Sequence, residues 1–224
     1  MQAQHTSQTR VKICCISSLA EARLAVEAEA SAVGLVSHMP SGPGVITEAE
    51  IQRILPHIPP HIETFLLTSL TRPQEIIAQH KRCPTTTLQF VDYIAPSAYT
   101  LVRTALPEVK LVQVIHVTGQ ESLKLASDYS QLADILLLDS GNPQLPVKEL
   151  GGTGRQHDWS ISAEIVSSVS SPVFLAGGLS AENVTMAINT VRPFGVDVCS
   201  GVREAKRLNE IRLRDFMANV PITM

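Results

Sequence analysis

Two side chains that can move protons stand at the ends of apolar runs far apart in this sequence. Cys14 lies near the end of the run from Val11 to Ile16, and Asp139 follows the run from Ile135 to Leu138. A thiolate can accept a proton and a protonated carboxyl can donate one, so the pair fits general acid-base chemistry. A free cysteine can equally be a small buried apolar side chain, and an aspartate after a strand can anchor a loop. Residue type alone leaves these structural roles open.

Glycine-rich stretches form a second group of candidate functional residues. The stretches are Gly151-Gly152-Thr153-Gly154, Ala176-Gly177-Gly178-Leu179-Ser180 and Cys199-Ser200-Gly201-Val202. A single stretch of this kind can simply make a tight turn. Two of them after consecutive strands favour an anion site, because glycine lets backbone N–H groups approach a phosphate closely. We therefore predict a phosphorylated substrate.

The elements that must position these residues alternate regularly between strand and helix. Each of eight β-branched or leucine-rich runs is followed by an amphipathic stretch of helical period, which predicts a (β/α)8 TIM barrel. Active sites of such barrels lie at the carboxyl ends of the strands. The runs are Val11 to Ile16, Ala32 to Ser37, Ile62 to Thr68, Thr86 to Asp92, Lys110 to Val117, Asp134 to Ser140, Pro172 to Gly178 and Gly195 to Gly201.

The length of the chain predicts one barrel domain over residues 10–224, preceded by a polar, flexible leader over residues 1–9. One connection, from Gly141 to Trp159, is much longer than the others. Long connections inside small domains usually bind ligands or cover sites, so we expect this loop to contact the substrate.

Side-chain alternation along the first strand predicts which residues point inward. Lys12 shares a face with Cys14, while Val11 and Ile13 share the opposite face with Cys15. A lysine between the sheet and its helices would lose hydration without compensation. We therefore expect Lys12 and Cys14 to point into the barrel and Cys15 to face the helices.

Composition excludes several classes of protein. The formal net charge is -3, 44% of residues are hydrophobic and 17% are charged. No basic cluster suggests nucleic-acid binding, and no segment suggests an export signal or a membrane anchor. The four cysteines have neither the spacing of a zinc site nor the density of a disulfide scaffold. We expect a cytoplasmic protein with reduced thiols and no metal site.

Taken together, these segments resemble the phosphoribosylanthranilate isomerase family of tryptophan biosynthesis, in the right order and over nearly the whole chain. The matching segments are Val11-Lys12-Ile13-Cys14, Leu137-Leu138-Asp139-Ser140, Gly151-Gly152-Thr153-Gly154 with Asp158-Trp159, Leu175-Ala176-Gly177-Gly178-Leu179 with Asn183-Val184, and Gly195-Val196-Asp197-Val198 with Ser200-Gly201-Val202.

The resemblance implies an Amadori rearrangement of N-(5-phosphoribosyl)anthranilate, a small phosphorylated sugar, by acid-base chemistry that requires no metal or organic cofactor. The sequence leaves the oligomeric state open, with a homodimer as one option. The resemblance also implies that Cys14 is the general base and Asp139 the general acid. The phosphate site that it implies consists of Gly177, Gly178, Ser200 and Gly201. Further substrate contacts are expected from Lys12, Gln89, Gly152, Thr153, Gly154, Arg155 and Arg203.

The chain departs from the family pattern at several positions. The family has glycine where Cys15 stands, a change for which we expect little cost. The loop from His38 to Gly44 lacks the arginine that usually binds the anthranilate carboxylate, and the family's Leu-His-Gly after the fourth strand is absent. The residue after Val202 is usually glutamate and here is Arg203.

Three interpretations follow from these departures. In a divergent phosphoribosylanthranilate isomerase, Arg203 or else Arg155 would take over carboxylate binding. In a related aldose-ketose isomerase, the phosphosugar would carry a different N-substituent. In the third, the barrel would bind a phosphosugar without catalysis, although such a protein needs neither Cys14 nor Asp139.

Overall fold

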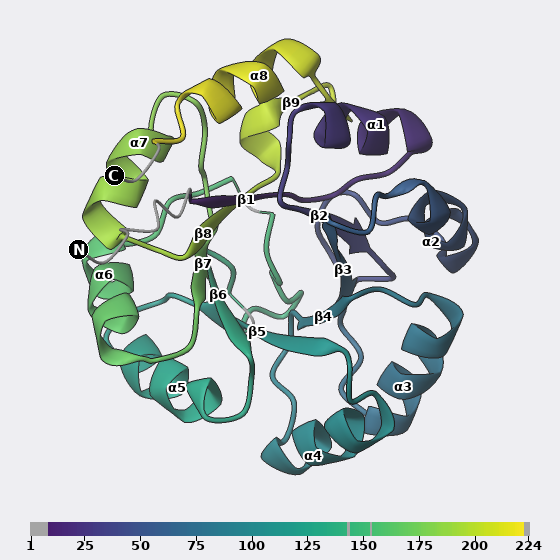
Figure 1. Ribbon diagram of the computed structural model, residues 1–224. Helices are drawn as coiled ribbons and strands as arrows, with labels where there is room; N and C mark the ends of the chain where they lie inside the picture. Colours follow the sequence, from purple (N-terminus) through teal and green to yellow (C-terminus); the bar gives the residue numbers. More distant parts are fainter. Residues whose placement is uncertain (1–8, 143, 153, 222–224) are drawn as a thin grey trace, which may run out of the picture.

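The computed structural model describes residues 9–221 except 143 and 153, and its centre is a closed barrel of eight parallel strands ringed by helices (Figure 1). The strands pair in sequence order, and β8 closes on β1. The predicted (β/α)8 barrel is therefore confirmed. Residues 1–8 of the predicted leader lie outside the described residues, and Thr9, the last of that segment, is buried.

Each of the eight predicted runs coincides with a strand, although β1 begins one residue before its run, and each of the first seven strands is followed by a helix before the next strand. The strands are β1 (Arg10–Ile13), β2 (Ala32–Val36), β3 (Glu63–Thr68), β4 (Thr87–Phe90), β5 (Lys110–His116), β6 (Ile135–Asp139), β7 (Val173–Leu175) and β8 (Gly195–Val198). The α-helices are α1 (Leu19–Glu27), α2 (Glu48–Ile54), α3 (Pro73–Arg82), α4 (Pro96–Ala105), α5 (Glu121–Ser130), α6 (Trp159–Ser168), α7 (Val184–Val191) and α8 (Glu210–Ala218).

Shorter elements complete the ring. Two 3₁₀ turns, η1 (Leu55–His57) and η2 (Ser200–Val202), follow α2 and β8, and a small hairpin of β9 (Arg203–Glu204) and β10 (Arg207–Leu208) precedes α8. In the described part of the chain, no helix is long and apolar enough to cross a membrane.

Side-chain alternation divides the apolar residues into two clusters. In β6, Leu136 and Leu138 pack in the layer between strands and helices, while Ile135 and Leu137 belong to the cluster inside the barrel. The same alternation carries Asp139 to the inner side at the end of the strand. The barrel scaffold thereby presents a carboxyl group at its open end.

Lys12 points into the barrel, as predicted, and is completely buried. Its Nζ forms an ion pair of 2.9 Å with Oδ2 of Asp197, its direct register partner on β8, and lies 5.1 Å from the ring centroid of Phe65. Burial opposes the charge on Lys12, but the carboxylate of Asp197 outweighs burial and raises the pKa of the lysine. Lys12 therefore stays charged at neutral pH and links the two strands that close the barrel.

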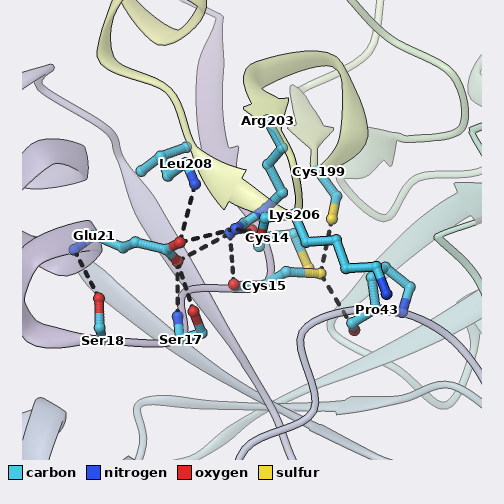
Figure 2. A network of polar contacts seen from close by, with 10 residues as sticks. All are labelled: Cys14, Cys15, Ser17, Ser18, Glu21, Pro43, Cys199, Arg203, Lys206 and Leu208. Atoms are coloured by element: carbon cyan, nitrogen blue, oxygen red, sulfur yellow. Dashed lines mark hydrogen bonds and ion pairs between the residues drawn. The ribbon is translucent and has the colours of Figure 1, made fainter.

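A second buried ion pair fixes the carboxyl end of β1 (Figure 2). The Arg203 guanidinium donates hydrogen bonds to both carboxylate oxygens of Glu21, at 3.0 and 3.2 Å, and to the carbonyl oxygens of Cys14 and Cys15, at 3.1 and 2.5 Å. Glu21 also accepts hydrogen bonds from the backbone N–H groups of Ser17 and Leu208. These contacts join β1, α1 and the β9–β10 hairpin.

This network corrects the prediction that Arg203 contacts substrate. Its position after β8 does place it near the open end of the barrel, but the side chain is only 8% exposed and turns toward Glu21. A guanidinium that already binds a carboxylate and two carbonyl groups has few donors left for a ligand. Arg203 is therefore a structural residue that holds the backbone of Cys14.

We expect Glu21→Gln to lower the free energy of unfolding at pH 7 by about 1.5 to 3 kcal/mol, because hydrogen bonds to charged groups are lost. Burial tends to raise the pKa of Glu21, but the hydrogen bonds from Arg203 and the backbone outweigh it and lower the folded-state pKa. The contribution is therefore complete above the unfolded pKa of about 4.3 and is lost as pH falls through the folded value.

Urea unfolding between pH 3 and pH 8 measures this difference. The matched control is Glu27→Gln, an exposed position on the same helix, which should behave like the wild type. A constant difference between wild type and Glu21→Gln down to the lowest pH would contradict the assignment.

We expect Lys12→Met to destabilise the fold by about 3 to 5 kcal/mol, because it leaves the Asp197 carboxyl buried without its cation. The double variant Lys12→Met/Asp197→Leu removes both charges and should recover most of that loss. Urea unfolding of the two proteins at pH 7 makes the comparison. Equal stability of the single and double variants would show that the ion pair between Lys12 and Asp197 does not couple β1 to β8.

Candidate active site

A cavity opens at the carboxyl ends of the strands, where the barrel architecture predicts the active site. Its empty volume, including space open to solvent, is about 660 Å³. Its lining comes mainly from the segments after β1, β2, β6, β7 and β8, with side chains from β3 and β4 at the base. Each candidate group from the sequence can therefore be placed relative to this cavity.

Cys14 and Asp139 both line the cavity, on opposite halves of the barrel. They are 5% and 8% exposed, so ligand in the cavity would largely remove them from water. Strand alternation predicted this placement, and the structure confirms the inward orientation of Cys14.

A glycine on the neighbouring strand makes room for the side chains of both Cys14 and Lys12 inside the barrel. A Cβ atom at Gly34 would lie 3.0 Å from Cys14 Sγ and 3.2 Å from Lys12 Nζ. Glycine on β2 therefore provides the room that both groups need. The charge of Lys12 lies close enough to stabilise a Cys14 thiolate by Coulomb attraction.

Asp139 is oriented by its own backbone neighbour and by a glycine. Its Oδ1 accepts a hydrogen bond of 2.7 Å from the backbone N–H of Ser140. A Cβ atom at Gly151 would lie 2.5 Å from Oδ2, and Gly151 has φ of +123°, a conformation that favours glycine. The loop after β6 thus approaches the carboxyl group closely without displacing it.

The loops after β7 and β8 contact each other through glycine. A Cβ atom at Gly201 would lie 2.0 Å from the carbonyl oxygen of Leu179, so no larger residue fits there without moving the backbone. Gly177, Gly178 and Ser200 line the cavity, whereas Gly201 supports the contact from behind. Gly177 and Gly178 have φ of +84° and +65° and, within the described residues, donate no backbone hydrogen bond. Their N–H groups are therefore available to an anion.

The long connection after β6 is docked over the barrel mouth. Leu150 is buried, Gly152 and Gly154 line the cavity, and a Cβ atom at Gly152 would lie 2.5 Å from Pro43 in the loop after β2. Thr153, predicted to contact substrate, lies outside the described residues. Lys148 pairs with Asp92 after β4, which ties the connection to the other side of the mouth.

Arg155 and Gln89 were also predicted to contact substrate. The Arg155 side chain is 59% exposed and pairs with Glu149 of the same connection, while its backbone packs against Gly178. Its role as a ligand for substrate stays a prediction. Gln89 lines the cavity, is 3% exposed, and in the described structure its buried Oε1 has no hydrogen-bond partner.

The prediction that Cys15 faces the helices is wrong. Its φ of +64° turns the chain out of the strand conformation, so the alternation of β1 no longer applies. The side chain instead joins the cluster inside the barrel and lines the cavity. The left-handed conformation also explains why glycine suits this position, and it means that cysteine there carries a conformational cost of about 1 kcal/mol or more.

Sequence reasoning missed Asp197 as a cavity residue. Its Oδ2 pairs with Lys12, its Oδ1 is buried, and it lines the cavity. Burial raises the pKa of Asp197, and the charge of Lys12 opposes this shift. The sequence did contain a signal for this residue. Asp197 is a charged residue in the last strand, which must pair with β1 to close the barrel, and it lies opposite Lys12 there.

Comparison with known proteins agrees with this arrangement. Residues 72–214 match the family model for N-(5'-phosphoribosyl)anthranilate (PRA) isomerase. The chain is 34% identical to the N-(5'-phosphoribosyl)anthranilate isomerase of Methanocella arvoryzae, over 96% of this chain and 99% of the relative. It is 33% identical to that of Nostoc punctiforme, over 88% and 90% of the two chains.

Solved structures give the same result. The phosphoribosylanthranilate isomerase of Thermotoga maritima superposes with a TM-score of 0.79 at 28% identity, over 95% of this chain and 98% of that one. A phosphoribosylanthranilate isomerase in complex with reduced 1-(o-carboxyphenylamino)-1-deoxyribulose 5-phosphate superposes with a TM-score of 0.76 at 26% identity, over 95% and 98%. By sequence over nearly its whole length, and by fold, the chain belongs to the N-(5'-phosphoribosyl)anthranilate isomerase family.

Proposed function

We propose that this protein is a phosphoribosylanthranilate isomerase, which converts N-(5'-phosphoribosyl)anthranilate to the 1-deoxyribulose 5-phosphate product. The observation that carries the proposal is that Cys14 and Asp139 line one cavity in a chain of this family. The reaction needs one acid and one base acting on the same sugar, and these two residues supply both.

The proposed reaction begins at Asp139. Its carboxyl group donates a proton to the ribose ring oxygen, the ring opens, and the nitrogen lone pair forms a Schiff base with C1'. Cys14, as thiolate, then removes the proton from C2', and those electrons form the enol and neutralise the iminium nitrogen. Tautomerisation moves a proton to C1' and gives the aminoketose. Lys12 stabilises the thiolate from behind the site.

The substrate phosphate fits the end of the cavity formed by Gly177, Gly178 and Ser200. Backbone N–H groups in left-handed glycine segments make a concave anion site, and loops after the seventh and eighth strands commonly provide one in this architecture. The aromatic N-substituent would then lie toward the loop after β2, where the cavity wall contains Met39, Leu67 and Leu150. Arg155 is our remaining candidate for its carboxylate.

We further propose that the protein acts in the cytoplasm as a homodimer, on a small phosphorylated substrate and without nucleic-acid or membrane partners. The charge and composition support the choice of partner and compartment. A structure from Thermotoga maritima, described as monomers generated from a dimeric phosphoribosylanthranilate isomerase, supports the assembly.

The direct test is turnover of N-(5'-phosphoribosyl)anthranilate by the purified protein, followed by loss of the anomeric proton signal in NMR. A parallel reaction with the N-phenyl analogue, which lacks the carboxylate, separates the two isomerase interpretations. Preference for the anthranilate compound supports the proposed substrate. Turnover of the analogue alone would indicate a different N-substituent, and turnover of neither would contradict isomerase activity.

We expect Cys14→Ser and Asp139→Asn each to lower kcat by about 10²-fold or more, because each removes one proton-transfer group. KM should stay within a few-fold of the wild type, since neither change enlarges or blocks the cavity. Circular dichroism verifies folding of both variants. Near-normal kcat in a folded variant would remove that residue from the proposed reaction.

We expect inorganic phosphate to inhibit competitively, and Gly178→Ala to raise both KM and the phosphate inhibition constant by about fivefold or more, because a Cβ atom at φ of +65° moves the N–H groups of the anion site. Gly119→Ala, after β5 and outside the cavity lining, is the matched control. The two constants should rise together. A rise in KM with unchanged phosphate inhibition would place the phosphate elsewhere.

A further inference from the structure

Two thiols that the proposed reaction does not use lie in contact at the cavity wall. The Sγ atoms of Cys15 and Cys199 are 2.8 Å apart and joined by a hydrogen bond (Figure 2). Both residues line the cavity, so a small solute can reach them from the barrel mouth. Cys14 Sγ lies instead beside Gly34 and Lys12, on the side of β2. The pair of Cys15 and Cys199 adjoins the proposed base, because Cys15 also forms a side-chain hydrogen bond with Cys14.

The strand pairing explains why these two side chains meet. Ile13 and Val198 are register partners on β1 and β8, and the N–H of Cys14 bonds the carbonyl of Val198. Cys15 and Cys199 follow these partners by two residues and one residue, so both lie just beyond the paired ends of the strands. The positive φ of Cys15 then turns its side chain toward Cys199 instead of the helices. A disulfide bond of about 2.05 Å requires the two sulfur atoms to approach by less than 1 Å.

The surroundings make Cys199 the more reactive of the two thiols. The hydrogen bond with Cys15 lowers the pKa of Cys199, burial opposes this, and the positive charge of Arg203 lowers it further. Hydrogen bonds with Cys14 and Cys199, together with burial, raise the pKa of Cys15 well above its usual value. A thiol with a lowered pKa in contact with a second thiol is the arrangement of redox-sensitive cysteine pairs.

We propose that Cys15 and Cys199 form a dithiol site that hydroperoxides oxidise to a disulfide, and that this oxidation reversibly inactivates the enzyme. The Cys199 thiolate attacks a peroxide oxygen, the O–O bond breaks, and Cys199 becomes a sulfenic acid while hydroxide leaves. The sulfur of Cys15 then attacks Cys199, the S–O bond breaks, and water leaves with the proton from Cys15. In total, two thiols and one hydrogen peroxide give one disulfide and two waters.

The disulfide would act on both halves of the site. Cys199 directly precedes Ser200 of the proposed phosphate site, and Cys15 directly follows Cys14. Movement of these backbones by a fraction of an ångström displaces the base and the phosphate N–H groups together. We expect kcat/KM to fall by about tenfold or more, since misplacement of about 1 Å can cost 10²-fold. This consequence rests on the proposed function, whereas formation of the disulfide does not.

The experiment treats the reduced full-length protein with hydrogen peroxide in about fivefold molar excess. Free thiols are then counted under denaturing conditions, and the disulfide is mapped by mass spectrometry of proteolytic peptides without reduction. We expect the count to fall from four to two, with Cys14 and Cys83 free. Activity and phosphate affinity should fall with the same time course and return after treatment with dithiothreitol.

Cys15→Gly and Cys199→Ser are the matched variants, and each is compared with itself before and after peroxide, so differences in basal activity cancel. Both should resist inactivation. Four free thiols after treatment, a disulfide that includes Cys14, or equal inactivation of the variants would overturn the proposal. So would a Cys15–Cys199 disulfide that leaves wild-type activity and phosphate affinity unchanged. If the reduced protein has no isomerase activity, the proposed function fails, and the mapped disulfide still decides whether the pair is oxidised.

Discussion

The guanidinium of Arg203 is the contact on which the geometry of this site depends. β1 ends at Ile13, so the backbone of Cys14 and Cys15 has left the regular ladder just where the proposed base must be held. Arg203 binds both carbonyl groups and is itself fixed by Glu21. A buried guanidinium requires a carboxylate partner, and this requirement joins α1 and the segment after β8 to the end of β1. Catalytic precision at Cys14 is thus supplied from outside the cavity.

The second buried pair has a different role. Lys12 and Asp197 face each other across the seam where β8 meets β1, beneath the proposed base. An apolar pair of similar size would pack as well, and replacing buried ion pairs in this way is often neutral for stability. The value of the pair is electrostatic, because it keeps a positive charge near Cys14 in a region of low dielectric constant. Asp197 compensates that charge and lines the cavity, with its second oxygen, Oδ1, buried.

The sequence predicts the barrel well because its signals are local and repeated. Alternating β-branched runs and helical periods identify all eight strands, and the burial cost of a lysine orients Lys12 and Cys14 correctly. Cys15 was assigned wrongly because alternation assumes extended dihedral angles, and nothing local reveals a φ of +64° in a cysteine. Arg203 was assigned wrongly because its position after a strand predicts the end of the barrel at which it lies but not the residue that its side chain binds. Its partner, Glu21, is 182 residues away and is identified only by the closed fold.

The cavity has a further property that constrains how it can recognise an anion. Among the described residues, its lining contains Asp139 and Asp197 but neither lysine nor arginine. A phosphate must therefore be held mainly by backbone dipoles, which are fixed in place and require no ordering of long side chains. Glycine at left-handed positions provides these dipoles, and the contact between Gly201 and Leu179 keeps the two loops in register.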